Sequence, residues 1–254
     1  MNALDITTAK QARLTPMMAQ YISVKEQYQE TLLFYRMGDF YEMFFHDAEV
    51  AAEALGIALT QRGKIEDRGI AMCGVPVHAL DGYLAKLIQK GFKVAICEQS
   101  ETPEAFKKRG GKGPLPRSVV RVVTPGTLQE DDLLRPHQHN FLAAIGWVAA
   151  DLAIAWADMS TGDFFVQPCK EADIGAVLAR LHAAELIYAD DLADRLGFVQ
   201  SELSMNYHLS AEASALFDHK KAIDRLADFY GVNTLQGFGQ FTPSMLSAVG
   251  GLLA

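Results

Sequence analysis

Residues 34–45 (FYRMGDFYEMFF) concentrate aromatic side chains around one carboxylate. A Gly-Asp pair at 38–39 signals a turn, and the residues from Phe40 onward predict a β-strand. Because side chains alternate along a strand, Phe40 and Glu42 share one face and Tyr41 points to the other. An exposed ring two residues from a carboxylate could stack on a flat partner while the carboxylate accepts a hydrogen bond.

The same spacing permits a structural alternative. Phe40 could belong to the core beside Phe34 and Phe44, which flank it in the same aromatic segment. Glu42 would then be a solvated residue at a strand edge. The residues alone do not decide between the two interpretations.

A second set of carboxylates suggests different chemistry. Asp151, Asp158 and Asp163 fall on two adjacent predicted strands, where paired carboxylates could hold two metal ions for phosphodiester cleavage. Against this metal-dependent nuclease, Asp151 and Asp163 lie near strand ends, where turn-forming Asp is common. A third possibility is that the second half, which is acidic, serves only to contact other proteins or domains.

No other cofactor site is indicated. The Gly-Lys pairs at 63–64 and 111–112 are followed by Ile65 and Gly113, so neither forms a G-x-x-x-x-G-K-[ST] phosphate loop. The three cysteines are too scattered for a CxxC metal site or a disulfide framework. We therefore expect no cofactor, no ATP and no metal in this chain.

Charge is distributed unevenly between the two halves. The formal net charge is -8, but residues 1–135 hold 17 Lys and Arg against 17 Asp and Glu, whereas residues 136–254 hold 6 against 14. Residues 105–129 contain no acid and several bases, which fits either a solvated loop or contact with phosphate. The bases are Lys107, Lys108, Arg109, Lys112, Arg117 and Arg121.

Length and composition favour two globular domains. The chain has 254 residues, half of them hydrophobic, which is enough for two cores and too apolar for intrinsic disorder. No apolar run is long enough to span a bilayer, and the N-terminus does not resemble a signal peptide. These features favour a cytoplasmic protein with no membrane partner.

The elements that must position the carboxylates and aromatics can be placed approximately. Residues 1–127 mix strands and helices in an α/β domain that includes strands at 57–61 and 70–75 around a charged loop. A linker is expected at 128–139. Residues 140–240 read as three antiparallel strands followed by alternating helix and strand, with helices at 210–229, which is a ribonuclease-H-like α/β order. Residues 241–254 begin a capped apolar helix that looks truncated.

Seven short motifs, in order along the chain, resemble the MutS family of bacterial DNA mismatch repair proteins. They are TPMM (15–18), LFYRMGDFYE (33–42), LTQRG (59–63), GVP (74–76), AICEQ (95–99), RVVTPGT (121–127) and DMSTG (158–162). The resemblance implies a mismatch-recognition domain, a noncatalytic connector domain, and the start of a helical core and lever region at 241–254.

The resemblance also implies specific roles. In the family, the Phe of a Phe-X-Glu motif enters the minor groove and stacks on the mispaired base, and the Glu hydrogen-bonds that base. Here these residues are Phe40 and Glu42; Arg62 could contact a phosphate, and Met72 could line the groove. The implied ligand is double-stranded DNA with mismatches or small insertion or deletion loops. For the full-length protein the resemblance implies a homodimer that uses ATP and Mg, acts with MutL, and works at the bacterial nucleoid.

Overall fold

The structure is a computed structural model that describes residues 14–65, 68–128, 139–196 and 207–254. The chain divides into two compact units, 1–124 and 125–254, and each unit has its own sheet. Both units combine helices with a mainly buried sheet, which confirms the predicted α/β class. Within the described ranges, no helix combines the length and the hydrophobicity needed to cross a membrane.

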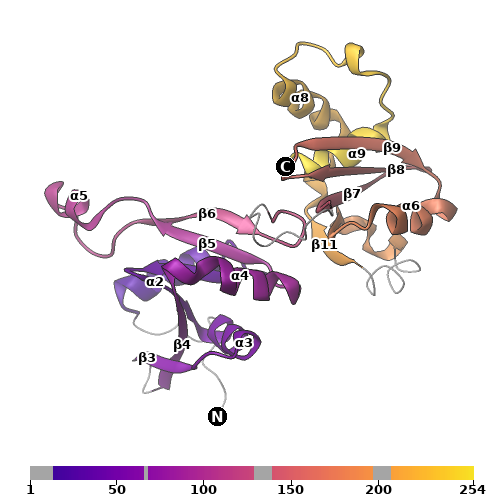
Figure 1. The fold of residues 1–254 in the computed structure, drawn as a ribbon. Coiled ribbons are helices and arrows are strands. Elements are labelled where there is room, and N and C mark those ends of the chain that lie inside the picture. Colours follow the sequence, from indigo (N-terminus) through magenta and orange to yellow (C-terminus); the bar gives the residue numbers. More distant parts are fainter. Residues whose placement is uncertain (1–13, 66–67, 129–138, 197–206) are drawn as a thin grey trace. The chain divides into compact units, whose positions relative to one another are not determined.

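The first unit is built on a mixed six-stranded sheet (Figure 1). β1 and β5 are parallel and the other neighbouring strands are antiparallel. The strand order is β3 (Thr60–Ile65), β4 (Arg68–Pro76), β2 (Phe40–Phe44), β1 (Leu32–Met37), β5 (Val94–Gln99) and β6 (Arg117–Val123). Because β1 and β5 run in the same direction, the chain segments that leave their carboxyl ends emerge at the same edge of the sheet.

Helices cover the sheet of the first unit on both faces. α2 (Pro16–Lys25) packs Met18, Tyr21 and Ile22 against one face of β1 and β2. α3 (Phe45–Leu55) and α4 (Leu80–Gln89) pack against β4 and β5. On the face that α2 packs against, Phe40 at the start of β2 is exposed.

Local sequence explains where the helices begin and end. Three of them begin with a Thr-Pro pair: the hydroxyl oxygens of Thr15, Thr102 and Thr242 each accept a bond of 3.2–3.3 Å from the backbone N–H three residues later, and proline occupies the first turn. These helices are α2, α5 (Pro103–Lys108) and α9 (Pro243–Leu252). α3 ends at Gly56 with a φ of 67°, which confirms the predicted glycine cap.

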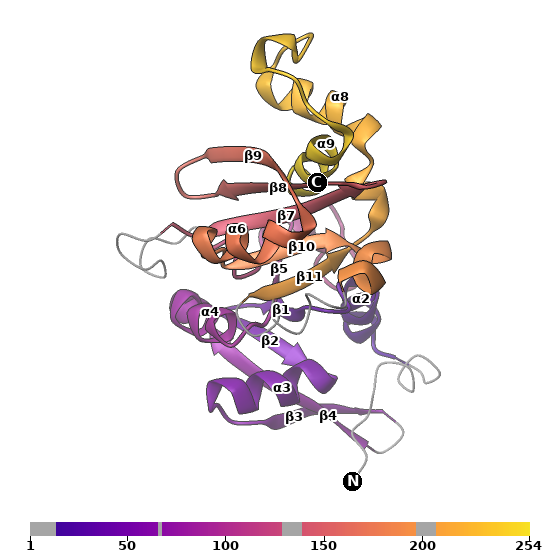
Figure 2. The ribbon, with the colours of Figure 1, turned by 90° about the vertical axis from the view of Figure 1, so that its right-hand side faces the viewer.

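The second unit has a five-stranded sheet between helices (Figure 2). Its order is β11 (His208–Glu212), β10 (Glu185–Ala189), β7 (Phe141–Val148), β8 (Asp151–Asp158) and β9 (Asp163–Cys169). β7, β8 and β9 are antiparallel, while β10 and β11 run parallel to β7. This is the ribonuclease-H-like order predicted from the sequence.

α6 (Ile174–Leu181) and α9 cover opposite faces of this sheet, and α8 (His219–Tyr230) packs on α9. Small residues on β7 and β8 let α9 approach closely: a Cβ on Gly146 would lie 2.2 Å from the Ser244 carbonyl oxygen and 2.3 Å from the Ala248 nitrogen. The sequence assigned 241–254 to a following helical region. In the structure, α9 instead packs on β7 and β8 and belongs to the second unit.

Other predicted boundaries need correction. β3 begins at Thr60 and continues through the charged residues that were expected to form a loop, with an irregularity where Gly63 has a φ of 74°. β11 lies where only helices were expected, because its short polar sequence lacks an apolar alternation. The predicted linker at 128–139 lies almost wholly outside the described residues. Short 3-10 helices lie at η1 (Val77–Ala79), η2 (Glu171–Asp173), η3 (Asp190–Leu192), η4 (Ser214–Phe217) and η5 (Gln236–Phe238).

Candidate nucleic-acid interface

Phe40 stands at the tip of the β1–β2 hairpin. It lies opposite Met37 across a two-residue turn in which Gly38 has a φ of 64°, a conformation that glycine adopts without strain. The Val77 N–H donates to the Asp39 carbonyl oxygen at 2.9 Å and fixes this turn to the end of β4. The hairpin therefore presents Phe40 on a held backbone.

Exposure distinguishes Phe40 from the other aromatics of its segment. Its side chain is 47% exposed, whereas Phe34 and Phe44 are fully buried. The structural alternative, in which Phe40 is a core residue, is therefore wrong. A large apolar ring held in solvent at a strand end is available to stack on a ligand.

Tyr41 anchors the strand on the face opposite Phe40. It is 3% exposed, packs against Phe34, and donates its hydroxyl hydrogen to the Glu98 carboxylate. Burial, together with the Glu98 hydrogen bond and charge, raises the pKa of Tyr41 to about 12, so the hydroxyl stays protonated at neutral pH. This anchor leaves Phe40 and Glu42 to project together from the other face.

Glu42 is held by Arg62. The Arg62 guanidinium reaches across β4, and its Nη1 contacts both carboxylate oxygens of Glu42. The side chain of Glu42 is 12% exposed and that of Arg62, which contacts the carboxylate, is 44% exposed. Gly74, opposite Glu42 on β4, leaves room for this arrangement, since a Cβ there would lie 3.6 Å from Glu42 Cγ and 3.3 Å from the Tyr41 carbonyl oxygen.

Sequence reasoning named Glu42 and Arg62 separately and missed their contact. It placed Arg62 in a loop after a strand ending at 61, whereas β3 continues to Ile65. Once the strand includes Arg62, alternation from Thr60 puts the arginine on the face of Glu42. Extending the predicted strand beyond residue 61 would have placed Arg62 beside Glu42.

Met72 lies on the same face but is engaged in packing. It is opposite Phe44 on β2, is half-buried, and packs against the cluster under α2. The Thr60 hydroxyl donates to the Met72 carbonyl oxygen at 3.0 Å and lies 3.7 Å from its sulfur. The core contacts account for this methionine without a ligand.

The basic residues of 105–117 form part of an arm beyond β5 and β6, with α5 near its tip (Figure 1). The Ser100 N–H donates to the Pro116 carbonyl oxygen at 3.0 Å and closes the neck of the arm. Lys107, Lys108 and Lys112 are exposed on it. The arm leaves the sheet beside the Gly38 turn, because β1 and β5 are parallel and both end at that edge.

Two arginines of the arm have structural contacts. Arg109 pairs with Glu101, and this pairing lowers the pKa of the Glu101 carboxyl through hydrogen bonding. Arg117 donates to the Arg36 carbonyl oxygen at 2.8 Å and lies over the Tyr35 ring at 4.8 Å. Arg117 therefore ties the base of the arm to the hairpin that carries Phe40.

The three aspartates of the second unit do not converge. Asp151 begins β8 and Asp158 ends it, so they lie about 23 Å apart at about 3.3 Å per residue. Asp163 is directly opposite Asp158 but is exposed and bonded to the Thr161 hydroxyl at 2.8 Å. No group of three or more His, Cys, Asp or Glu suited to a metal occurs in the described parts of the chain. The alternative of a metal-dependent nuclease site formed by these three aspartates is therefore not supported.

Asp158 is committed to local structure. It is 2% exposed and accepts bonds from the Ser160 N–H (2.9 Å), the Ser160 hydroxyl (2.6 Å) and the Asn140 N–H (3.3 Å). His139 Nδ1 lies 3.0 Å from its Oδ2. Burial alone would raise the pKa of Asp158, but these hydrogen bonds outweigh it and hold the pKa below its ordinary value.

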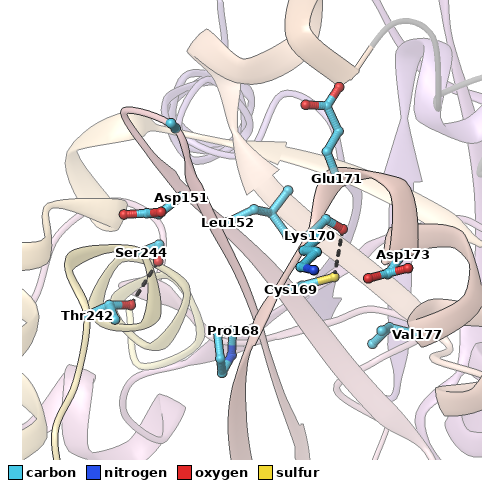
Figure 3. Close-up of a pocket in the computed structure, with 11 residues that line it drawn as sticks. Asp151, Leu152, Pro168, Cys169, Lys170, Glu171, Asp173, Val177, Thr242 and Ser244 are labelled. Atoms are coloured by element: carbon cyan, nitrogen blue, oxygen red, sulfur yellow. Dashed lines mark hydrogen bonds between the residues drawn. The ribbon is translucent and has the colours of Figure 1, made fainter.

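The second unit also has an open depression of about 600 Å³ beside the start of β8 (Figure 3). Asp151, Glu171 and Asp173 line it, but their carboxylates point in different directions. Lys170 and Cys169 lie between them, and Thr242 and Ser244 close one side. This arrangement brings no catalytic set together.

Comparison with known proteins identifies both units. Residues 15–132 match the family model of MutS domain I, and residues 140–254 match that of MutS domain II. The chain is 53% identical over 243 residues to the DNA mismatch repair protein MutS of Ruegeria pomeroyi and 52% identical over 240 residues to that of Cereibacter sphaeroides. Each alignment covers 94% of this chain and 27% of the relative. The chain thus spans about a quarter of the length of these relatives.

Proposed function

The chain belongs to the MutS family of DNA mismatch repair proteins, and from this premise we propose that its first unit recognises mispaired or unpaired bases in duplex DNA. Phe40 would enter the minor groove and stack on the affected base, and Glu42 would hydrogen-bond that base. The exposure of Phe40 on an anchored hairpin is the observation that carries this proposal.

The energetics suit a reader of many different mispairs. Inserting an apolar wedge unstacks a base step at a cost of a few kcal/mol, and this cost is lower where pairing is already defective. Stacking of an aromatic ring on a base returns about 1–3 kcal/mol whichever base it is. Phe40 would therefore report deformability rather than sequence, while Glu42 would discriminate through a donor on the base edge.

We propose supporting roles for the remaining parts. Lys107, Lys108 and Lys112 would contact phosphates beside the wedge, since the arm leaves the same edge of the sheet. The acidic second unit would act as a connector that contacts other domains or a MutL-type partner. In the full-length protein we expect a homodimer in the bacterial cytoplasm at the nucleoid. ATP and Mg would bind elsewhere in that protein, because this sequence contains no phosphate loop.

A gel-shift experiment with the full-length protein tests the wedge. Matched, G·T and single-base-insertion duplexes are compared for wild type, Phe40→Ala and Phe165→Ala. Phe165, in the second unit, is an apt control because its side chain is also 47% exposed. We expect Phe40→Ala to lose about 10- to 100-fold in mismatch preference, the equivalent of one stacked base, and Phe165→Ala to retain it. A preference that survives Phe40→Ala would refute the proposal.

A further inference from the structure

The contact between Arg62 and Glu42 has a consequence for how the carboxylate could reach a base. Among the described residues, Arg62 supplies the hydrogen bonds to the Glu42 carboxylate. The side chain of Glu42 is 12% exposed and that of Arg62 is 44% exposed, so a donor on a base edge has to compete with the guanidinium for the carboxylate oxygens. The resting pair is electrically neutral, so an anionic side chain can approach phosphates without strong repulsion.

We infer that Arg62 is an exchangeable partner of Glu42: a hydrogen-bond donor on a mispaired base displaces the guanidinium, which then moves onto a nearby phosphate. This inference rests on the proposed function of Phe40 and Glu42. It assigns Arg62 a specificity-determining role, in place of a phosphate contact made on every duplex.

Only at a mismatch do both Glu42 and Arg62 keep a charged or hydrogen-bonding partner after the exchange. There, Glu42 trades the arginine for a base donor, and Arg62 trades the carboxylate for a phosphate, so both charges stay partnered. On matched DNA the bases stay stacked and their pairing edges are occupied, so opening the Glu42–Arg62 pair offers Glu42 no donor from those edges and would leave it desolvated beside phosphates. The closed pair is therefore the stable state on matched DNA.

The position of the pair favours movement of Arg62 rather than of Glu42. Glu42 lies in the middle of the sheet, with its Cγ packed over Gly74 and its strand held from below by Tyr41. Arg62 comes from β3 at the edge of the sheet, next to the irregularity at Gly63. The long, half-exposed arginine side chain is thus the mobile member of the pair.

Salt dependence gives the exchange a measurable signature. Each phosphate contact contributes about 0.9 to the slope of log K against log salt for duplex DNA. A guanidinium that reaches a phosphate only at a mismatch makes that slope steeper on mismatched than on matched DNA by about this amount. Wild-type mismatch preference should then fall about threefold between 50 and 200 mM salt through Arg62 alone.

The experiment measures fluorescence anisotropy of matched and G·T duplexes with the full-length protein at several salt concentrations. In Arg62→Gln the difference in slope between the duplexes should decrease by about 0.9. In Glu42→Gln the arginine is free on both duplexes, so the matched slope should steepen to meet the mismatched one. Arg62→Lys should retain part of the difference. Arg68→Gln, which removes an exposed arginine opposite Ile65 at the turn of the same hairpin, should leave the difference unchanged.

Two results would overturn the exchange. If Arg62→Gln flattens the slope equally on both duplexes, Arg62 contacts phosphate at all times. If it changes neither slope, Arg62 has no contact with DNA. Either result leaves the wedge intact provided that Phe40→Ala still abolishes mismatch preference. A mismatch preference that survives Phe40→Ala instead rejects the proposed function itself.

Discussion

Glu42 on β2 of the first unit and Asp158 at the end of β8 in the second unit are both hydrogen-bonded carboxylates, but their donors differ. Glu42 is bonded by one long side chain that reaches it from another strand. Asp158 is bonded by Ser160, on the turn that follows it, and by Asn140 and His139, which directly precede β7. Two of these bonds come from backbone N–H groups.

This difference separates a carboxylate that can change partners from one that cannot. Backbone donors are fixed by the fold, so Asp158 can leave them only if the turn unfolds. An arginine side chain can rotate away without disturbing a strand, so the bonds of Glu42 are compatible with ligand exchange. Asp158 is the more buried of the two carboxylates, but Glu42 is the one whose hydrogen-bond donor can be exchanged for a ligand.

The largest expected effect is on the stability of the second unit. Asp158→Ala leaves buried donors without an acceptor and should lower the free energy of unfolding by about 2–4 kcal/mol. Urea unfolding followed by tryptophan fluorescence reports this unit selectively, because both tryptophans, Trp147 and Trp156, lie in it. Asp163→Ala, on the next strand and exposed, should change the midpoint little. Equal effects of the two substitutions would mean that the donors around Asp158 do not hold it more firmly than an exposed carboxylate is held.

The acid dependence of stability should be smaller but of definite sign. The pKa of Asp158 is lowered in the folded state, so below about pH 4 the unfolded chain binds more protons and the second unit loses stability. Asp158→Asn cannot titrate and should show a flatter decline between pH 6 and pH 3 in the same fluorescence assay. A decline as steep as that of the wild type would mean that other carboxyls dominate.

Much of the fold follows from local sequence. Thr15 and Thr242 cap helices as expected, Gly56 ends one, and the aromatic alternation from Phe40 places Phe40 and Glu42 on one face. Each of these features is decided by residues within one or two turns or along one strand. The exposure of Phe40 could not be deduced in this way, because it depends on which parts of the folded chain pack around the β1–β2 hairpin.

The missed features depend on segments distant in sequence. The Glu42–Arg62 pair joins residues 20 apart on strands that are not neighbours, and it required the true length of β3. β11 was missed because a short edge strand gains its stability from pairing with β10 rather than from its own propensity. Asp158 was considered a metal ligand because sequence shows a carboxylate but not the donors that Ser160 and Asn140 bring to it.

Glu42→Gln tests the exchangeable carboxylate, Glu42, by its effect on binding to matched DNA. Loss of the negative charge frees Arg62 and removes repulsion, so binding to matched duplex should strengthen by severalfold, the equivalent of about 1 kcal/mol. The ratio of affinities for mismatched and matched duplexes should decrease, because a neutral amide does not need a hydrogen-bond donor on the base to offset its desolvation. Titration of matched and G·T duplexes at fixed salt measures both effects. An equal loss of affinity on the two duplexes would count against a discriminating role for this carboxylate.

The smallest effect is expected on the arm, where the basic side chains are exposed rather than held. Lys112→Gln should reduce the salt slope of DNA binding by about 0.9 on matched and mismatched duplexes alike, because a flexible lysine on phosphate reads neither base nor deformability. Lys86→Gln, on α4 and also exposed, provides a charge-matched control that should leave the slope unchanged. Equal behaviour on both duplexes would separate the arm from Arg62, whose contribution should appear only at a mismatch. A mismatch preference altered by Lys112→Gln would instead extend the discriminating surface from the wedge into the arm.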